Sequence, residues 1–372
     1  MKRLILAGGG HAHLHVLLTL ARKKPQGVEI VLISPFGRQI YSGMLPGWMA
    51  GHYQLDQCVA YLERLARVAG VRFVQDEVIR LDANCSLIGC AQSGEFGYDL
   101  LSIDTGAMAD TSTLAATGAR LLPIRPLEAF VVGWERQLAN FIQTGAARLA
   151  VVGAGAAGVE LALAARHRLT TMLDKAHVEV FLIEGGGLLR GHGDQVVQRI
   201  ARELTTRGVQ RIASRAAGSP AGLVFPDGSE LAIDCVIGTT GVVPAPWIAS
   251  SGLARADDGF IAVADGQRSA SHPQVFAAGD VATRIDQPHA KSGVYAVRAG
   301  PALSANLLNT LVGRPIEPHR PQRRSLYLLA TGPREAIVSW SGWTSGGAWA
   351  WRWKDWIDRR FMKQYAIASS ST

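Results

Sequence analysis

The chain has 372 residues, of which 48% are hydrophobic and 18% are charged, so its composition excludes a disordered polypeptide. The length exceeds what one compact core usually holds, and we expect two domains. The formal net charge of +8 is uneven, because ten Lys/Arg stand against four Asp/Glu between residues 314 and 363. Basic character is therefore a property of the C-terminal part, and we expect no nucleic-acid partner.

The chain carries few signals for export or for a membrane span. Its start, MKRLILA, resembles a secretion signal, but glycines and histidines interrupt the apolar region directly afterwards. No stretch reaches the roughly 18 uninterrupted apolar residues of a membrane helix. The four cysteines are too few and too scattered for a disulfide scaffold. We expect a cytoplasmic protein that can contact the inner face of a membrane peripherally.

The first predicted unit is a strand, a glycine-rich turn, a helix and a second strand. An apolar run at residues 3–7 leads into Gly8 to Gly10, a helical stretch spans about 12–22, and an apolar strand spans 28–33. Glycine allows a tight turn that brings backbone N–H groups against a pyrophosphate, and the helix N-terminus adds a fractional positive charge. In this context the glycines predict a dinucleotide site.

A second unit repeats this pattern about 145 residues later. The apolar residues 149–152 precede the motif GAGAAG at 153–158, and a predicted helix over 159–168 follows. The next strand, 178–183, ends in Glu184, 26 positions after the last glycine. A carboxylate there can accept both ribose hydroxyls of NADH and would repel the extra phosphate of NADPH. Two such patterns in one chain favour two nucleotide sites over two unrelated glycine turns.

The first copy departs from the second at two positions. His13 stands where the third glycine is expected, and the strand that should end in an acidic residue ends at Ser34. Serine can hydrogen-bond a ribose but carries no charge. Because pyrophosphate binding depends mainly on the first two glycines, we expect a dinucleotide here as well, with helix–strand packing at His13 left open.

Four segments, in this order, resemble the two-dinucleotide-binding-domain flavoproteins of the pyridine nucleotide-disulfide oxidoreductase superfamily. They are the turn at 8–10, the sequence YDLLSIDTG at 98–106, the turn at 153–160 and the sequence VFAAGD at 275–280. The resemblance covers about residues 1–310 and implies FAD at the first turn and NADH at the second. In the family, the aspartate of the last segment, here Asp280, hydrogen-bonds the ribityl chain of the flavin.

The same resemblance implies two sets of cofactor contacts. The residues expected to bind FAD are Gly8, Gly9, Gly10, His11, Ala12, Ser34, Val78, Thr105, Gly106, Gly279, Asp280, Lys291, Gly293 and Val294. Those expected to bind NADH are Gly153, Gly155, Gly158, Glu160, Glu184 and Gly241.

Within the superfamily the chain is most similar to type II NADH dehydrogenases and sulfide:quinone oxidoreductases. Closer still is a flavoprotein group fused ahead of a selenide, water dikinase domain. The strings GGGHAH at 8–13, YSGMLPG at 41–47 and WRWKDW at 351–356 resemble that group. The 372 residues include no such kinase domain.

A redox disulfide is not expected. Cys85 and Cys90 have the C-x4-C spacing of flavin-linked disulfides, but they lie in a predicted peripheral β-meander as ordinary strand cysteines. In enzymes that use such a pair, it lies on the helix after the second strand, here residues 40–51, which contain no cysteine. Cys235 lies in a predicted strand, where a buried cysteine is usually a small core residue. Electrons are therefore expected to pass from NADH to flavin and directly to an acceptor.

Two charged residues are candidates for catalytic roles. Lys291 is expected to begin a helix whose N-terminus, in related enzymes, points at the flavin pyrimidine ring and borders the acceptor site; the alternative is a solvated lysine. Glu160 resembles the glutamate on the nicotinamide side of related enzymes; the alternative is a surface glutamate. His11, His13 and His15 form an HxHxH run, but no carboxylate or cysteine cluster completes a coordination shell, and no metal is expected.

The C-terminal segment is expected to form a helix from about Trp349. Trp349, Trp353 and Trp356 lie near one face. Arg352 and Arg359 lie opposite. Three roles stay open for this helix: a membrane headgroup interface, a subunit contact, or a cap packed on the FAD domain.

The predicted fold is α/β, with two Rossmann-like dinucleotide-binding domains of three β/β/α layers and a small C-terminal segment. The FAD domain is expected at 1–120 and 264–325, the inserted NADH domain at 121–263, and the C-terminal segment at 326–372. The expected activity is hydride transfer from NADH to FAD and reduction of a quinone-like or other small acceptor. Two alternatives stay open: a flavoenzyme of selenium or sulfur metabolism, and a non-catalytic NADH-binding flavoprotein scaffold.

Overall fold

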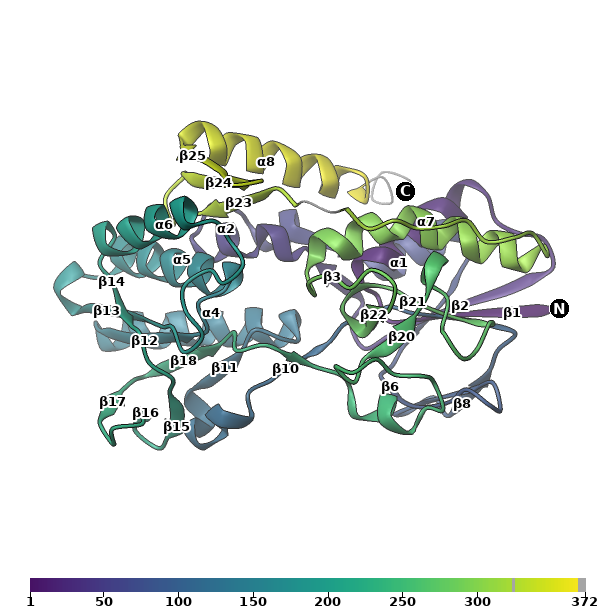
Figure 1. The fold of residues 1–372 in the computed structure, drawn as a ribbon, viewed down its shortest axis with the longest axis horizontal. Coiled ribbons are helices and arrows are strands. Elements are labelled where there is room, and N and C mark those ends of the chain that lie inside the picture. Colours follow the sequence, from purple (N-terminus) through teal and green to yellow (C-terminus); the bar gives the residue numbers. More distant parts are fainter. Residues whose placement is uncertain (323–324, 367–372) are drawn as a thin grey trace.

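Two parallel β-sheets, each covered by helices on one face, form two lobes that lie side by side (Figure 1). This computed structural model describes residues 1–322 and 325–366. The C-terminal hairpin and helix lie along one side of the molecule, at the top of Figure 1. None of the helices in the described residues combines the length and apolarity that a membrane span requires.

The first sheet combines strands from distant parts of the chain. Its parallel order β21-β9-β1-β2-β5 corresponds to Val275–Ala277, Leu100–Ile103, Lys2–Ala7, Val28–Ser34 and Arg72–Gln75. One face is covered by α1 (His11–Arg22), α3 (Leu62–Ala69) and α7 (Gly293–Leu311). The other is covered by the antiparallel strands β6 (Val78–Asp82), β7 (Leu87–Cys90) and β8 (Glu95–Gly97).

The apolar run of β1 explains this three-layer packing. Successive side chains of a strand point to opposite faces, so Leu4 and Leu6 contact the helices while Ile5 and Ala7 contact the meander. A strand buried on both faces is apolar throughout, as this one is from Leu4 onward.

The second sheet repeats the architecture. Its parallel order β11-β18-β12-β13-β14 corresponds to Leu121–Pro123, Cys235–Gly238, Ala147–Val152, Val178–Ile183 and Val209–Ile212. Helices α4 (Leu127–Thr144), α5 (Ala156–Met172) and α6 (Asp194–Thr206) pack on one face. The strands β15 (Ala217–Ser219), β16 (Gly222–Val224) and β17 (Glu230–Ala232) pack on the other.

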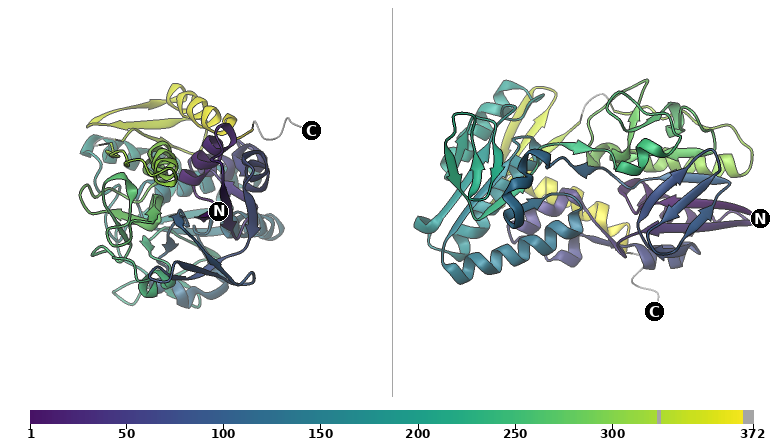
Figure 2. Two further views of the ribbon diagram at one scale, coloured as in Figure 1. Left: turned by 90° about the vertical axis from the view of Figure 1, so that its right-hand side faces the viewer. Right: turned by 90° about the horizontal axis from the view of Figure 1, so that it is seen from below.

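The chain crosses between the lobes twice (Figure 2). The crossing segments pair as short antiparallel strands, β10 (Met108–Ala109) and β19 (Val242–Val243). After the second crossing, β21 returns to the first sheet beside β9. The predicted α/β fold, with one Rossmann-like domain inserted in the other, is confirmed by this topology.

The remaining elements are short or C-terminal. They are β3 (Arg38–Ile40), α2 (Leu45–Met49), β4 (Val59–Tyr61), β20 (Ile261–Val263), β22 (Ala282–Arg284), β23 (Tyr327–Ala330), β24 (Ala336–Trp340), β25 (Trp343–Gly347) and α8 (Ala348–Lys363). The last three strands form an antiparallel sheet on which α8 packs. Leu329 and Ile337 join the core of the second lobe, whereas Trp351 and Met362 join that of the first. The C-terminal segment therefore packs against both lobes.

Three expectations about these elements need correction. Helix α7 begins at Gly293, so Lys291 lies before it rather than in its first turn. Cys85 lies in an exposed turn between β6 and β7, not in a strand. The face of α8 that packs on the protein carries Trp351 and Met362, whereas the predicted apolar face, with Trp349 and its neighbours, is exposed. The α8 orientation follows from the ion pair of its buried face, described below.

Candidate active site

The first glycine turn lies at the carboxyl end of β1, against the buried side chain and backbone of Asp104. Gly8 has φ +93°, and a Cβ there would come within 2.4 Å of the Asp104 carbonyl oxygen. A Cβ on Gly10 would come within 2.3 Å of the Asp104 carboxylate. Burial raises the pKa of Asp104 to about 7, while hydrogen bonds from the N–H groups of His13 and Ala12 oppose the rise. Only glycine fits this cradle at the N-terminus of α1.

His13 bridges the turn and the neighbouring strand. Its ring is fully buried, with Nδ1 2.6 Å from the Gly8 carbonyl oxygen and Nε2 2.8 Å from Ser102 Oγ. Burial lowers its pKa to about 4, so the imidazole is neutral and can donate with one nitrogen and accept with the other. Helix–strand packing, which the sequence left open here, is thus achieved through a histidine hydrogen-bonded on both sides.

His11 presents an unsatisfied nitrogen at the same helix N-terminus. Its side chain is buried, and Nε2 has no hydrogen-bond partner. Burial lowers its pKa to about 4, with Asp280 and Arg125 acting in opposite directions. A buried polar atom without a partner is costly, so this nitrogen indicates a position for a polar ligand group.

Asp280 closes the cradle from beyond the end of β21, which lies two strands away from β1 in the same sheet. It follows Gly279, whose φ is +71° and whose Cβ would come within 2.7 Å of Asp104 Oδ1. The Asp280 carboxylate forms a 2.5 Å ion pair with Arg125, which follows β11 of the second sheet. Arg125 was not predicted as a site residue. Its position directly before Pro126 was the only available signal in the sequence.

The other residues expected at FAD lie around this edge. Ser34 ends β2, is buried, and donates its hydroxyl hydrogen to the Phe36 carbonyl 3.1 Å away. Thr105 and Gly106 follow Asp104 after the end of β9, and Gly293 and Val294 lie in the first turn of α7. Val78 starts β6, and its side chain packs in the core below the sheet, so only its backbone could face a ligand.

Lys291 is neither solvated nor placed by a helix. Its Nζ donates to the Ala282 carbonyl at 2.5 Å and to Thr283 Oγ1 at 2.6 Å, and it lies 3.9 Å from the Phe260 ring centroid. Burial lowers its pKa to about 8, although Asp258 and Asp280 favour the charged form.

The second glycine turn has tighter contacts than the first. Gly153, with φ +111°, faces Thr239, and a Cβ would come within 2.4 Å of the Thr239 carbonyl oxygen. A Cβ on Gly158 would come within 1.8 Å of the Gly153 carbonyl oxygen. Gly155 caps α5 with open space before it. Gly241, with φ +142°, lies in the open at the second crossing.

Glu184 directly follows β13, beside this turn, and is held by an arginine. Arg211 Nε and Nη2 lie 2.5 and 3.0 Å from the two carboxylate oxygens, a bidentate pair. The pairing fixes the carboxylate at the strand end where a ribose would lie. Arg211 could not be predicted from the sequence, because no local pattern connects it with Glu184.

Glu160 faces the C-terminal segment instead of solvent, so the surface alternative is wrong. Its Oε1 accepts the Ala330 N–H at 2.9 Å. Burial raises the pKa of Glu160 to about 7, while Lys354 opposes the rise. Lys354 Nζ donates to the Gly43 carbonyl at 2.6 Å and to Asp358 at 2.8 Å. Lys354 thus connects α8 to the segment 41–47, a contact that spans over 300 residues and that the sequence did not reveal.

No disulfide joins any two of the four cysteines. Cys58, Cys85, Cys90 and Cys235 are all free thiols. Burial raises the pKa of Cys58 and of Cys235 to about 12, which disfavours the reactive thiolate. Tyr41 is the first residue of the segment 41–47. Its ring centroid lies 4.5 Å from that of Phe361 and 5.7 Å from that of His11. Within the described residues no group of three or more metal-binding side chains is found.

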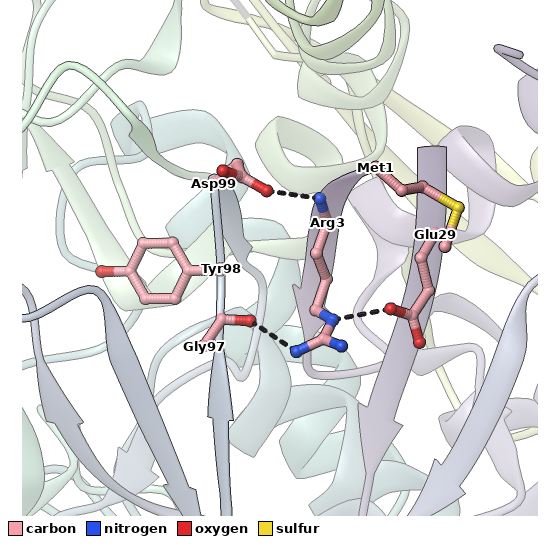
Figure 3. Close-up of a pocket in the computed structure, with 6 residues that line it drawn as sticks. All are labelled: Met1, Arg3, Glu29, Gly97, Tyr98 and Asp99. Carbon is pink, nitrogen blue, oxygen red and sulfur yellow. Dashed lines mark hydrogen bonds and ion pairs between the residues drawn. The ribbon is translucent and has the colours of Figure 1, made fainter. Parts of the chain in front are cut away.

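An open cavity at the opposite end of β1 is not part of this site (Figure 3). It is lined by Met1, Arg3, Glu29, Gly97, Tyr98 and Asp99. Arg3 is 2.7 Å from Glu29, and its backbone N–H donates to Asp99 at 2.6 Å, so the charges around it are mutually paired.

These residues fit a dinucleotide at each turn. Glycine cradles at two helix N-termini leave room for pyrophosphates, and the buried His11 Nε2 offers the first one a partner. Residues 2–300 match the family described as pyridine nucleotide-disulphide oxidoreductase. The fold and the two turns thus define a flavoprotein oxidoreductase that uses FAD and a pyridine nucleotide.

The chain belongs to the pyridine nucleotide-disulphide oxidoreductase family, as the resemblance implied. It is 26% identical over 335 residues to an NADH dehydrogenase-like protein of Mycobacterium tuberculosis, covering 85% of this chain and 82% of that one. It is 24% identical to a demethylphylloquinone reductase of Synechocystis, covering 91% and 87%. The fold is similar to that of the sulfide:quinone oxidoreductase of Aquifex aeolicus, with TM-score 0.81, 17% identity and coverage of 99% and 92%. The predicted class, an FAD-dependent NADH oxidoreductase, is confirmed.

Proposed function

We propose that this enzyme passes a hydride from NADH at the second turn to FAD at the first, and electrons onward to a quinone-like or other small acceptor without a redox disulfide. The observation that carries this proposal is the pair of glycine cradles at the carboxyl ends of two parallel sheets, connected by two short crossings. FAD, when bound, supplies the acceptor for the hydride and the donor for the next substrate. The protein positions both and sets the local charge.

The residues proposed for FAD are those of the first cradle together with Arg125. Gly8 to Gly10 and the start of α1 would hold the pyrophosphate, with His11 Nε2 donating or accepting at its edge. Asp280 would hold the ribityl chain, and its ion pair with Arg125 fixes the carboxylate. Lys291 would add positive charge near the N-terminus of α7, where its low pKa also allows it to exchange a proton.

The residues proposed for NADH are those of the second cradle. Gly153, Gly155 and Gly158 would admit the pyrophosphate, and Glu184, fixed by Arg211, would accept the ribose hydroxyls. Glu160 has a pKa of about 7, so it can hold or release a proton at Oε close to neutral pH. We propose that it exchanges protons during acceptor reduction.

The proposed acceptor class follows from the relatives and from the thiols. One relative is a demethylphylloquinone reductase, and the fold is shared with a sulfide:quinone oxidoreductase. The buried Cys58 and Cys235, with raised pKa values, do not favour a thiol relay, which a flavoenzyme of sulfur or selenium substrates would be expected to use. A quinone is lipid-soluble, and we therefore propose that the enzyme works at the inner face of a membrane.

Steady-state NADH oxidation with a water-soluble quinone tests this proposal. We expect turnover that depends on added FAD and that survives prior alkylation of the accessible thiols. Loss of turnover in Cys58→Ala or Cys235→Ala, in variants that still bind FAD and NADH, would indicate a thiol relay instead. No turnover with any quinone, in a protein that binds FAD and NADH, would favour the non-catalytic scaffold.

A further inference from the structure

The carboxylate expected at the nucleotide ribose is paired with an arginine from the neighbouring strand. Glu184 directly follows β13, and Arg211 lies on β14, which pairs with β13 in parallel at the left of Figure 1. Arg211 Nε and Nη2 lie 2.5 and 3.0 Å from the two carboxylate oxygens. The Glu184 side chain is only 4% exposed, so water and salt screen this ion pair less than a surface pair.

This pairing changes the charge that a nucleotide meets at the strand end. A carboxylate without a partner at this position repels the 2′-phosphate of NADPH, and on that basis the sequence predicted NADH. With Arg211 in contact, the two side chains together carry no net charge. The repulsion is therefore cancelled at the place where the ribose would lie.

Arg211 keeps donors for a second acceptor. A guanidinium has five N–H groups, and the bidentate contact with Glu184 uses two of them. The Arg211 side chain is 35% exposed, so the arginine reaches solvent while its partner does not. The hydrogen bond to Glu184 raises the pKa of Arg211, which keeps the guanidinium charged. Its planar fork matches the geometry of a phosphate.

A second arginine and open backbone lie beside this pair. Gly185 follows Glu184, and a Cβ on Gly185 would come within 3.0 Å of the side chain of Arg215, which is exposed. Gly186 and Gly187 are exposed as well, and a Cβ on either would meet no described atom within 4 Å. The segment after β13 thus leaves room for an added phosphate next to two cationic side chains.

We infer that the second site takes NADPH as well as NADH, and that Arg211 is the residue that determines this specificity. With NADH, Glu184 accepts hydrogen bonds from the ribose hydroxyls. With NADPH, Glu184 keeps the 3′-hydroxyl while Arg211 contacts the 2′-phosphate and Arg215 adds positive charge. The 2′-phosphate is remote from the nicotinamide, so the hydride transfer is the same for both donors. The inference rests on the proposed function, but binding of the adenosine end can be measured without turnover.

Isothermal titration of the FAD-loaded full-length protein with ADP-ribose and with 2′-phospho-ADP-ribose tests the inference. We expect the two dissociation constants to lie within about tenfold of each other. Rising salt should weaken binding of 2′-phospho-ADP-ribose more than binding of ADP-ribose. Arg211→Gln should weaken 2′-phospho-ADP-ribose about thirtyfold relative to ADP-ribose, because a charged hydrogen bond is lost. Arg211→Lys, which keeps the charge, should restore part of this ratio.

Steady-state kinetics give an independent measurement. With a quinone as acceptor, kcat/KM for NADPH should lie within about tenfold of that for NADH. Arg211→Gln should lower the ratio of the two values about thirtyfold, through KM for NADPH rather than through kcat, because the 2′-phosphate is bound alike in ground and transition states.

A matched control uses another arginine–glutamate pair of the same strand. Arg148 Nε lies 2.7 Å from Glu179, at the opposite end of β13. Arg148→Gln should leave the relative affinity for the two fragments unchanged.

Three results would overturn the inference. They are 2′-phospho-ADP-ribose binding to the parent more than about a hundredfold more weakly than ADP-ribose, an unchanged affinity ratio in Arg211→Gln, and an equal fall of that ratio in Arg148→Gln. The expected fragment affinities in a protein that oxidises neither nucleotide would support the inference and count against the proposed function alone.

Discussion

At the scale of single residues, the second cradle depends on the absence of one methyl group. Gly158 lies in the first turn of α5, and its Cα faces the Gly153 carbonyl so closely that a Cβ would lie 1.8 Å from the oxygen. The Gly153 carbonyl is backbone, accepts a hydrogen bond from Thr239 Oγ1, and cannot rotate away. By contrast, a Cβ added to Gly186, which lies after β13, would have no atom within 4 Å.

We therefore predict that Gly158→Ala destabilises the protein by about 1–3 kcal/mol through overpacking. Gly186→Ala should change stability by less than about 0.5 kcal/mol, because its site is unconfined. Urea denaturation of both variants measures the difference. Equal midpoints would show that helix α5 can shift to accept the methyl group.

A second prediction for a single residue concerns Arg125. Replacing it with Gln removes the charge that fixes Asp280 and leaves a buried carboxylate without its ion-pair partner. We expect FAD affinity to fall about tenfold or more, measured by fluorescence on release of the flavin. Arg136→Gln, an exposed position on α4, is the control and should bind FAD like the parent. Unchanged affinity in Arg125→Gln would exclude Arg125 from the FAD site.

Because the pKa of Glu160 is raised, we expect the free energy of unfolding to depend on pH. Its pKa is about 7 in the folded protein against 4.5 as the ordinary value, so the folded state holds the proton more tightly. The stability it contributes is complete below about pH 4.5 and is lost as pH rises through about 7, a change of about 3 kcal/mol. Glu160→Gln keeps the acceptor for the Ala330 N–H and should flatten the unfolding free energy between pH 5 and 8. Asp104, whose pKa is also about 7, would account for the remaining slope.

At the scale of elements, helix α8 is attached to the protein through a buried charge. Lys354 is paired with Asp358 one turn later and also donates to the Gly43 carbonyl, in the segment beside His11. Burial lowers the pKa of Lys354, but the carboxylates of Asp358 and Glu160 outweigh it and the pKa is raised overall. The lysine therefore stays charged, and its partners are required.

We predict that Lys354→Met costs about 3 kcal/mol, because it leaves the buried Asp358 unpaired. The double variant Lys354→Met with Asp358→Leu should recover part of this loss, since it removes the orphaned charge as well. Thermal unfolding of the FAD-loaded variants measures both. A double variant no more stable than the single one would show that the Gly43 contact, not the ion pair, holds α8.

Sequence patterns predicted the helices, strands and turns whose structure is determined by residues close together in the chain. The turns at 8–10 and 153–158 lie between apolar strands and helices, and glycine is required there by close backbone contacts. The face of α8 could not be predicted this way. Its tryptophans form the more apolar stripe, yet the side with the Lys354–Asp358 pair packs inward, because partners distant in sequence satisfy those charges.

At the scale of the whole molecule, the parts of the site that the sequence missed are those made between distant segments. Arg125 meets Asp280 across 155 positions, and Lys354 meets Gly43 across 311. No periodicity or motif encodes such pairs. The order of the two units along the chain, by contrast, follows directly from the repeated strand–turn–helix pattern, and the family match over residues 2–300 agrees with it.

The C-terminal segment connects the two lobes at this scale. Ala330 donates to Glu160 and Glu335 pairs with Arg207 of the second lobe, while α8 packs on the first. His52, which follows α2, also lies 2.8 Å from the Gly332 carbonyl oxygen. The segment therefore restrains the relative position of the two cradles, which hydride transfer between them requires.

The proposed hydride transfer takes place between the two dinucleotide sites of this one chain. Anaerobic titration of the FAD-loaded protein with NADH, followed by visible absorption, tests this transfer. We expect one equivalent of NADH to bleach the flavin and a quinone to restore the colour. A protein that binds no FAD, or whose bound flavin keeps its colour under excess NADH, would contradict it.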